Sequence, residues 1–190
     1  MVKTVKIADR EINYQVINRR VKYPRLEFKT GGLVIILPEA ATHDEQLVSK
    51  YRSWIANKSD AINSAITSAA KKKLVLHRSS RDFSVMVDRL ISEHAKTLHV
   101  NPGKTFVRAM RSKWASLSAR RNLTLNSHLR QLPSDLVSYV IYHELCHLTE
   151  RRHNARFWAL VERKYPNHDK LETVLLEYWF LIRDNEQKGE

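Results

Sequence analysis

Two histidines four residues apart, His143 and His147, enclose a glutamate in the stretch YVIYHELCHLTERRHNARFW, residues 139–158. Residues four apart on a helix project from the same face, so both imidazoles can reach one zinc ion at about 2.0–2.1 Å. Glu144 is rotated by about 100° from His143, which is beside the ligand face but too far round for a good ligand. A general base must lie there, next to a metal-activated water molecule. The pattern therefore predicts a zinc site with hydrolytic chemistry.

Spacing alone leaves the third ligand open. His153 lies six residues after His147, or about 600° of helical rotation, so an unbroken helix would point it away from the other two. The helix must therefore stop between residues 148 and 152. We favour His153 because imidazole suits zinc and closes the site locally. The alternative is a glutamate on a following helix: Glu162, Glu172 or Glu177.

The turn before His153 lacks its usual glycine. In the metzincin pattern HExxHxxGxxH a glycine breaks the helix, whereas Glu150 occupies that position here. Arg151, Arg152 or Asn154 must then make the turn. Asparagine tolerates left-handed geometry, and Asn154 could equally cap the next helix.

The chain is strongly basic, with 33 Lys and Arg against 20 Asp and Glu, a formal charge of +13 and a pI near 10.0. Such a balance favours a polyanionic partner such as nucleic acid. Residues 101–130 contain no acidic side chain but seven basic ones: Lys104, Arg108, Arg111, Lys113, Arg120, Arg121 and Arg130. We expect nucleic acid to be bound through this basic surface.

The chain has few signs of a membrane or secretory protein. Its longest apolar runs are too short to cross a bilayer, and its N-terminus has no apolar core typical of a signal peptide. A single cysteine excludes an internal disulfide framework and fits a reducing compartment. We expect a cytoplasmic protein without a membrane partner, and the sequence leaves its oligomeric state open.

Local patterns predict an α+β fold. Strands are expected over residues 2–7, 12–17, 26–28 and 33–37, with a hairpin at Gly31–Gly32, and helices follow up to Lys73. A further helix is expected over residues 83–98. Two short strands, 105–110 and 123–126, then precede a buried helix that begins near Pro133 and carries the histidines. We therefore expect an N-terminal region, 1–73, of strands and helices and a hydrolase region, 74–190, packed as one compact unit.

The segment WASLSARRNLTLNSHLRQLPSDLVSYVIYHELCHLTERRHNARFW resembles the YgjP-like metallopeptidase family. The matching positions are Trp114, Ser116, Asn126, Leu132, Pro133, residues 143–148, Glu150, His153, Phe157 and Trp158. The resemblance implies a zincin-like domain with a short sheet and an active-site helix. It also implies Zn²⁺ bound by His143, His147 and His153, with Glu144 as the base.

The family is related to SprT-like and WLM proteases, some of which cleave proteins crosslinked to DNA. The resemblance therefore implies a protein or peptide substrate and suits a DNA-associated peptidase. Zincins place an edge strand before the metal helix to pair with the substrate, and we expect residues 123–126 to be that strand. Six residues are expected to contact substrate: Asn126, His128, Arg120, Arg121, Arg152 and Arg156.

Two other functions fit parts of the sequence. A metal-dependent hydrolase of nucleotide phosphoanhydrides could clamp phosphates with arginines near the motif, although the chain has no glycine-rich phosphate cradle. Those arginines are Arg120, Arg121, Arg151, Arg152 and Arg156. A basic nucleic-acid-binding module with a structural zinc is the other alternative, but structural zinc is normally closed by four protein ligands.

Overall fold

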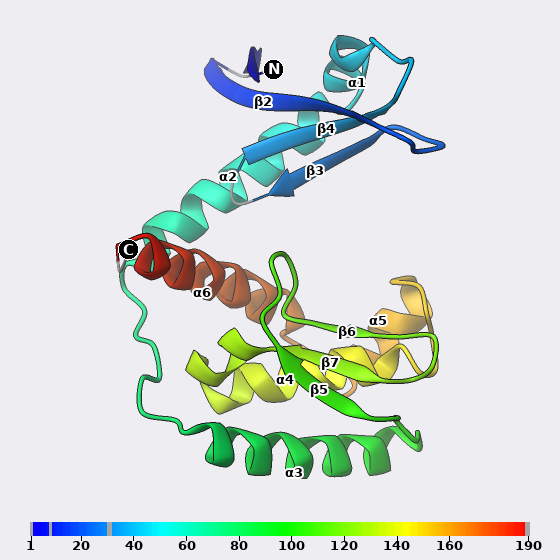
Figure 1. Ribbon diagram of the computed structural model, residues 1–190, viewed down its shortest axis with the longest axis vertical. Helices are drawn as coiled ribbons and strands as arrows, with labels where there is room; N and C mark the ends of the chain where they lie inside the picture. The colour runs from blue at the N-terminus through cyan, green and yellow to red at the C-terminus, as the bar shows by residue number, and fades with distance from the viewer. Residues whose placement is uncertain (1, 8, 30–31, 189–190) are drawn as a thin grey trace. The chain divides into compact units, whose positions relative to one another are not determined.

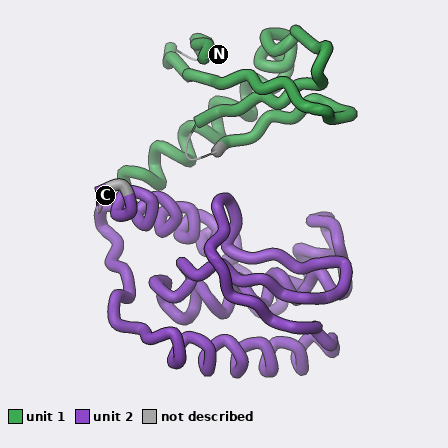
Figure 2. Tube along the Cα trace, viewed as in Figure 1, with its two compact units in different colours: residues 1–67 green, residues 68–190 purple. Residues whose placement is uncertain are grey.

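The computed structural model describes residues 2–7, 9–29 and 32–188, and the chain divides into two compact units, residues 1–67 and 68–190 (Figure 2). Each unit combines a small sheet with helices (Figure 1). The α+β class predicted from the sequence is therefore confirmed.

Unit 1 is a four-stranded sheet followed by helices. Its elements are β1 (Val2–Ile7), β2 (Arg10–Arg19), β3 (Arg25–Lys29), β4 (Gly32–Pro38), α1 (Asp44–Lys50) and α2 (Arg52–Ala69), which runs past the unit boundary. The strand order is β1-β2-β4-β3, with β2 and β4 parallel and the other pairs antiparallel. The hairpin predicted between β3 and β4 is present as a strand pair, and residues 30 and 31 of its turn lie outside the described residues.

The core of unit 1 forms around β4. The continuous apolar run of β4, residues 33–37, is buried along its length, as expected of a strand paired on both sides. Asp44, at the start of α1, is also buried and accepts hydrogen bonds from Lys3 Nζ at 2.8 Å and Tyr14 Oη at 3.0 Å. These contacts satisfy a carboxylate that burial would otherwise destabilise.

Unit 2 contains the histidine motif. Its elements are α3 (Ser80–Leu98), β5 (Thr105–Arg108), β6 (Ala115–Leu117), β7 (Leu123–Asn126), the 3₁₀ helix η1 (Ser127–Gln131), α4 (Ser134–Cys146), α5 (Ala155–Glu162) and α6 (His168–Lys188). Helix α3 begins earlier than predicted, because Ser79 caps it through its side chain, which accepts from the Asp82 amide. The strands form a sheet in the order β5-β7-β6.

Helix α4 is the centre of unit 2. It contacts α3, α5, α6 and β6, and its apolar residues are buried on nearly all sides. A helix that is apolar all round is expected in the interior. The motif residues His143 and Glu144 lie near its C-terminal end, and both are only partly buried.

The edge strand beside α4 is not the one predicted. Residues 123–126 form β7, which is the central strand of its sheet and is buried at all four positions. The expectation that this strand pairs with substrate is therefore wrong, because both its edges already pair with β5 and β6. Strand β6, which the sequence patterns did not reveal, is the edge strand next to α4. Within the described part of the chain, no helix is long and apolar enough to cross a membrane.

Candidate active site

Helix α4 ends inside the histidine motif. Its last residue is Cys146, and His147 is the C-cap with its amide directed to the Glu144 carbonyl. The next three amides, of residues 148–150, also donate to carbonyls of residues 145 and 146. The helix therefore tightens and stops earlier than residues 148–152, where we expected it to end.

The chain then turns back without a left-handed residue. The non-glycine residues of the described chain that have positive φ all lie outside this turn, and residues 147–154 contain no glycine. Glu150 accepts a hydrogen bond from the Arg152 amide at 3.2 Å, and Asn154 caps α5 by accepting from the Phe157 amide at 3.1 Å. Of the two roles left open for Asn154, the capping role is confirmed.

The turn brings together the three histidines predicted as ligands. Each of His143, His147 and His153 offers one ring nitrogen, and these atoms lie within 4.8 Å of one another. The Nε2 atoms of His143 and His153 are 3.0 Å apart, close to the roughly 3.3 Å expected between two donors of a tetrahedral zinc site. The donor set suits zinc, since imidazole is among its preferred ligands.

The aromatic residues of α5 support this cluster. The buried ring of Phe157 lies 4.9 Å from His143, 4.5 Å from His147 and 4.6 Å from His153, measured between ring centroids. Trp158 stacks on His153 with centroids 5.6 Å apart. Phe157 therefore packs against all three imidazoles, and Trp158 covers one face of His153.

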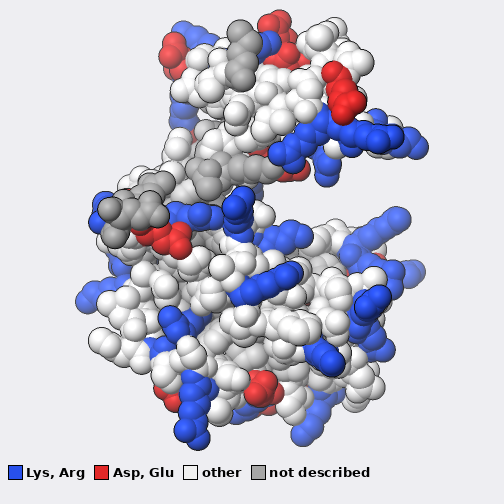
Figure 3. Space-filling model, viewed as in Figure 1, with Lys and Arg blue, Asp and Glu red and all other residues white. Residues whose placement is uncertain are grey.

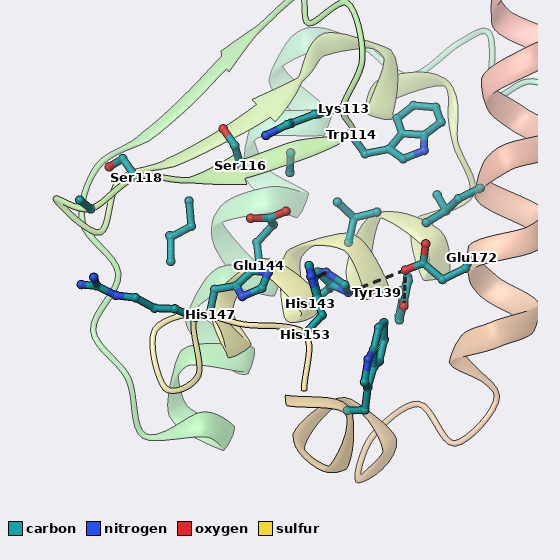
Figure 4. A pocket seen from close by; sticks show the side chains of 17 residues that line it. Lys113, Trp114, Ser116, Ser118, Tyr139, His143, Glu144, His147, His153 and Glu172 are labelled. Carbon is teal, nitrogen blue, oxygen red and sulfur yellow. Dashed lines mark hydrogen bonds and ion pairs between the residues drawn. The ribbon is translucent and has the colours of Figure 1, made fainter. Parts of the chain in front are cut away.

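Glu144 lies beside the histidines and points towards β6 (Figure 4). Burial raises the pKa of its carboxyl to about 7, although the Lys113 ammonium and a hydrogen bond from the Leu117 amide act in the opposite direction. Burial likewise lowers the pKa of His143 to about 3, with a contribution from His147 and His153. At neutral pH His143 is therefore a neutral imidazole, the form that binds a metal.

These side chains border a cavity of about 870 Å³. One wall is the chain from Lys113 to Ala119, which includes β6, and the other is the face of α4 with Tyr139, Val140 and the motif residues (Figure 4). Arg151 and Trp158 line it from the turn and α5, and Glu172 and Leu175 line it from α6. The cavity is large enough for several residues of a peptide.

Asn126 does not line this cavity. Its side chain is fully buried, and its amide nitrogen donates to the carbonyls of Met110 and Lys113 at 2.9 and 2.8 Å. Asn126 therefore holds the loop that carries Lys113 to the cavity, and its effect on the site is indirect. The structure gives no support to its predicted contact with substrate, because no part of Asn126 is accessible.

The other predicted substrate residues also lie away from the cavity lining. His128 pairs with Glu186 of α6 at 3.2 Å. The four arginines of the same prediction, Arg120, Arg121, Arg152 and Arg156, are exposed. Their contact with substrate stays a prediction, whereas Lys113 and Arg151 line the cavity directly.

The three glutamates considered as a third ligand are not part of the histidine cluster. Glu162 lies 3.4 Å from His168, and Glu177 pairs with Lys72 at 3.0 Å. Glu172 lines the cavity and accepts a hydrogen bond from Tyr139 Oη at 2.6 Å. The sequence could have indicated Tyr139, which is four residues before His143 and so on the same face of the helix. No local signal connects Glu172 to the motif.

Residues 54–178, or 125 of the 190, match the YgjP-like metallopeptidase domain. The metallopeptidase zymogen abylysin of Pyrococcus abyssi is 25% identical over 46% of this chain and 87% of that chain, with a TM-score of 0.42. The metallopeptidase zymogen jannalysin of Methanocaldococcus jannaschii is 22% identical over 48% of this chain and 94% of that chain, with a TM-score of 0.45. No curated protein matches the sequence significantly.

Proposed function

Because this chain belongs to the YgjP-like metallopeptidase family, we propose that it hydrolyses peptide bonds with a zinc ion and with Glu144 as the general base. The proposed zinc ligands are His143, His147 and His153. The observation that carries the proposal is the convergence of three imidazoles and one carboxylate on a single cavity. Three protein ligands leave a coordination position open, as in catalytic rather than structural zinc sites.

Zinc bound there would polarise the scissile carbonyl and lower the pKa of a water molecule towards neutrality. Glu144 takes a proton from the attacking water at its carboxylate and delivers it to the leaving nitrogen as the C–N bond breaks. A carboxyl whose pKa is raised to about 7 by burial can both accept and return a proton near neutral pH.

The edge of β6 supports a peptide as the substrate. Only one edge of β6 pairs within the sheet, with β7, and residues 113–119 line the cavity opposite Glu144. An extended peptide can add to such an edge through its backbone, independently of its side chains. A peptide bound at this edge would lie in the same cavity as the motif residues of α4.

The geometry favours a peptidase over a hydrolase of nucleotide phosphoanhydrides. Of the five arginines considered as a phosphate clamp, only Arg151 lines the cavity. Phosphate recognition normally uses several bidentate arginine contacts. A single arginine at the cavity does not make such a clamp.

We also propose that the basic surface binds nucleic acid. All seven basic residues of the segment 101–130 are exposed, and none of them forms an ion pair within the described part of unit 2. Figure 3 shows basic side chains over much of the visible face of unit 2 and only a few acidic ones. Exposed cations that contact a phosphate backbone release its counterions, so the binding would depend strongly on salt.

The peptidase proposal is tested with the variant Glu144→Gln. This change retains the shape of the side chain and removes its basicity, so zinc content should be unchanged while hydrolysis of casein falls by at least about 1,000-fold. The matched control is Glu162→Gln on α5, outside the cavity, which should retain activity. Full activity of Glu144→Gln would refute the assignment of the base.

Nucleic-acid binding is tested with single-stranded DNA at low and raised salt. Replacing Arg108 and Arg111 by alanine should weaken binding. The slope of the logarithm of the binding constant against the logarithm of salt concentration should become shallower by about one for each phosphate contact that is lost. The control is Arg89→Ala, because Arg89 is exposed but already paired with Glu93 at 3.5 Å. Absence of DNA binding at low salt would refute this part of the proposal.

A further inference from the structure

One ring nitrogen of His143 has no hydrogen-bond partner among the described residues. Its Nε2 faces His153 at 3.0 Å, whereas its Nδ1 is buried and makes no hydrogen bond. The nearest carboxylate oxygen, Oε1 of Glu172, lies 3.7 Å from this Nδ1. A buried imidazole N–H without a partner is costly, and the atom that could accept it is less than 1 Å beyond hydrogen-bond distance.

The position of the Glu172 carboxylate is itself fixed. The same Oε1 atom accepts the Tyr139 hydroxyl hydrogen bond at 2.6 Å. Tyr139 is fully buried one turn before His143 on α4, with its ring centroid 6.0 Å from that of His143. Figure 4 shows Glu172 beside Tyr139, on the side of His143 away from Glu144. Tyr139 therefore keeps a half-exposed glutamate beside one particular imidazole nitrogen.

His147 shows what such a contact does for a ligand. Its Nδ1 lies 3.1 Å from the carbonyl oxygen of Glu150, so Nδ1 carries the proton and donates it. This contact leaves Nε2 of His147 free to bind a metal. His143 needs the same arrangement, and Glu172 is the carboxylate placed to provide it.

We propose that Glu172 is a positioning residue that accepts a hydrogen bond from the Nδ1–H of His143 and thereby orients this imidazole towards the metal, with Tyr139 holding the carboxylate in place. The proposal rests on the proposed function, because it requires His143 to be a ligand. A carboxylate behind a ligating imidazole fixes its tautomer and increases its basicity, and removal of such a partner typically costs 10–100-fold in metal affinity. Glu172 is thereby distinguished from a ligand, the role considered for it from the sequence.

The experiment measures zinc affinity of the full chain by competition with a chelator. Glu172→Ala should weaken zinc binding by about 10- to 100-fold, and Tyr139→Phe should weaken it less and in the same direction. Glu172→Gln should give an intermediate affinity, because an amide oxygen can still accept the hydrogen bond from His143 but carries no charge. The visible spectrum of the cobalt-loaded protein should retain the same coordination number in all three variants.

The matched control is Glu186→Gln. Glu186 lies on the same helix, is exposed to a similar degree and is also paired with a histidine, His128, away from the cavity. Its replacement should leave zinc affinity unchanged. Thermal unfolding of the metal-free protein separates a positioning role from a purely structural one. If Glu172 only ties α4 to α6, Glu172→Gln should have a lower melting temperature and an unchanged zinc affinity. This result would overturn the proposal.

Three further outcomes are decisive. Loss of zinc binding in Glu172→Ala as complete as in His143→Ala, with a changed cobalt spectrum, would make Glu172 a ligand and overturn its positioning role. If wild-type protein binds zinc and His143→Ala does not, unchanged affinity in Glu172→Ala overturns this inference alone. If His143→Ala retains wild-type affinity, the proposed zinc site is itself wrong.

Discussion

A buried histidine distant from the motif should make the stability of unit 2 depend on pH. His94 of α3 is almost completely buried, with a relative exposure of 1%. Its Nε2 lies 2.9 Å from Ser138 Oγ on α4, and its Nδ1 accepts from Lys164 Nζ at 3.1 Å. Ser138 continues the network to Tyr165 Oη at 2.8 Å. The network holds His94 as a neutral imidazole between three segments of the unit.

Protonation of His94 is therefore disfavoured in the folded state. Burial, reinforced by the Lys164 ammonium, lowers the pKa of His94 from 6.5 to about 4. Between these values the unfolded chain binds a proton that the folded chain does not, so stability rises with pH in this window and is lost as pH falls through it. Each pH unit is worth about 1.36 kcal/mol, so His94 removes about 3 kcal/mol of stability between pH 6.5 and pH 4.

The assay is urea unfolding of the metal-free protein at pH 4, 5, 6 and 7, followed by tryptophan fluorescence. Three of the four tryptophans, Trp114, Trp158 and Trp179, lie in unit 2. The variant His94→Gln retains polar contacts but cannot titrate, so its loss of stability over this range should be smaller by about 3 kcal/mol. His77→Gln, at an exposed position without these contacts, is the control. Equal pH slopes for wild type and His94→Gln would refute the reasoning.

Three further perturbations should give measurable effects. Asn126→Ala should lower the free energy of unfolding of unit 2 by roughly 2–4 kcal/mol, because the carbonyls of Met110 and Lys113 lose their buried donor. It should also reduce turnover, because Lys113 would be displaced from the cavity. Urea unfolding measures the first effect and a casein assay the second. In unit 1, burial alone would raise the pKa of Asp44, but hydrogen bonds from Lys3 and Tyr14 outweigh it and lower that pKa. The stabilisation is thus present above pH 3.8 and lost as pH falls further, and urea unfolding of Asp44→Asn should lack this loss. Removal of zinc by a chelator should lower the melting temperature of unit 2, by an amount that corresponds to about 2.7 kcal/mol if zinc had been present at about 100 times its Kd.

Features of the fold that depend on nearby residues were predictable from the sequence. The apolar spacing from Leu136 to Leu145 indicates a helix, and its near-complete burial follows from apolar residues on most of its faces. The spacing of His143 and His147 predicts neighbouring imidazoles, and these lie together in the structure. Each prediction uses contacts within one or two helical turns, where spacing determines geometry.

Features that depend on distant segments were not predictable in this way. Strand β6 has only three residues, too few for an alternation to be recognised, and the order β5-β7-β6 is determined by long-range pairing. Glu172 reaches the site from α6, 29 residues after His143, and no spacing rule covers such a distance. The choice of residues 123–126 as the edge strand failed for the same reason, because order along the chain does not determine order in a sheet.

The turn before His153 explains why a motif glycine can be absent. A glycine is required only where the backbone must adopt positive φ, and no residue of this turn does so. Helix α4 instead ends at Cys146, and the amides of residues 147–149 donate to the carbonyls three residues earlier, as in a tightened last turn. Glu150 then contributes two acceptors: its carbonyl oxygen to His147 Nδ1 and its carboxylate to the Arg152 amide. Glycine at this position would keep the hydrogen bond of the carbonyl and remove that of the side chain. The glutamate therefore stabilises the turn through its side chain, whereas the metzincin pattern uses the wider range of backbone angles that glycine allows.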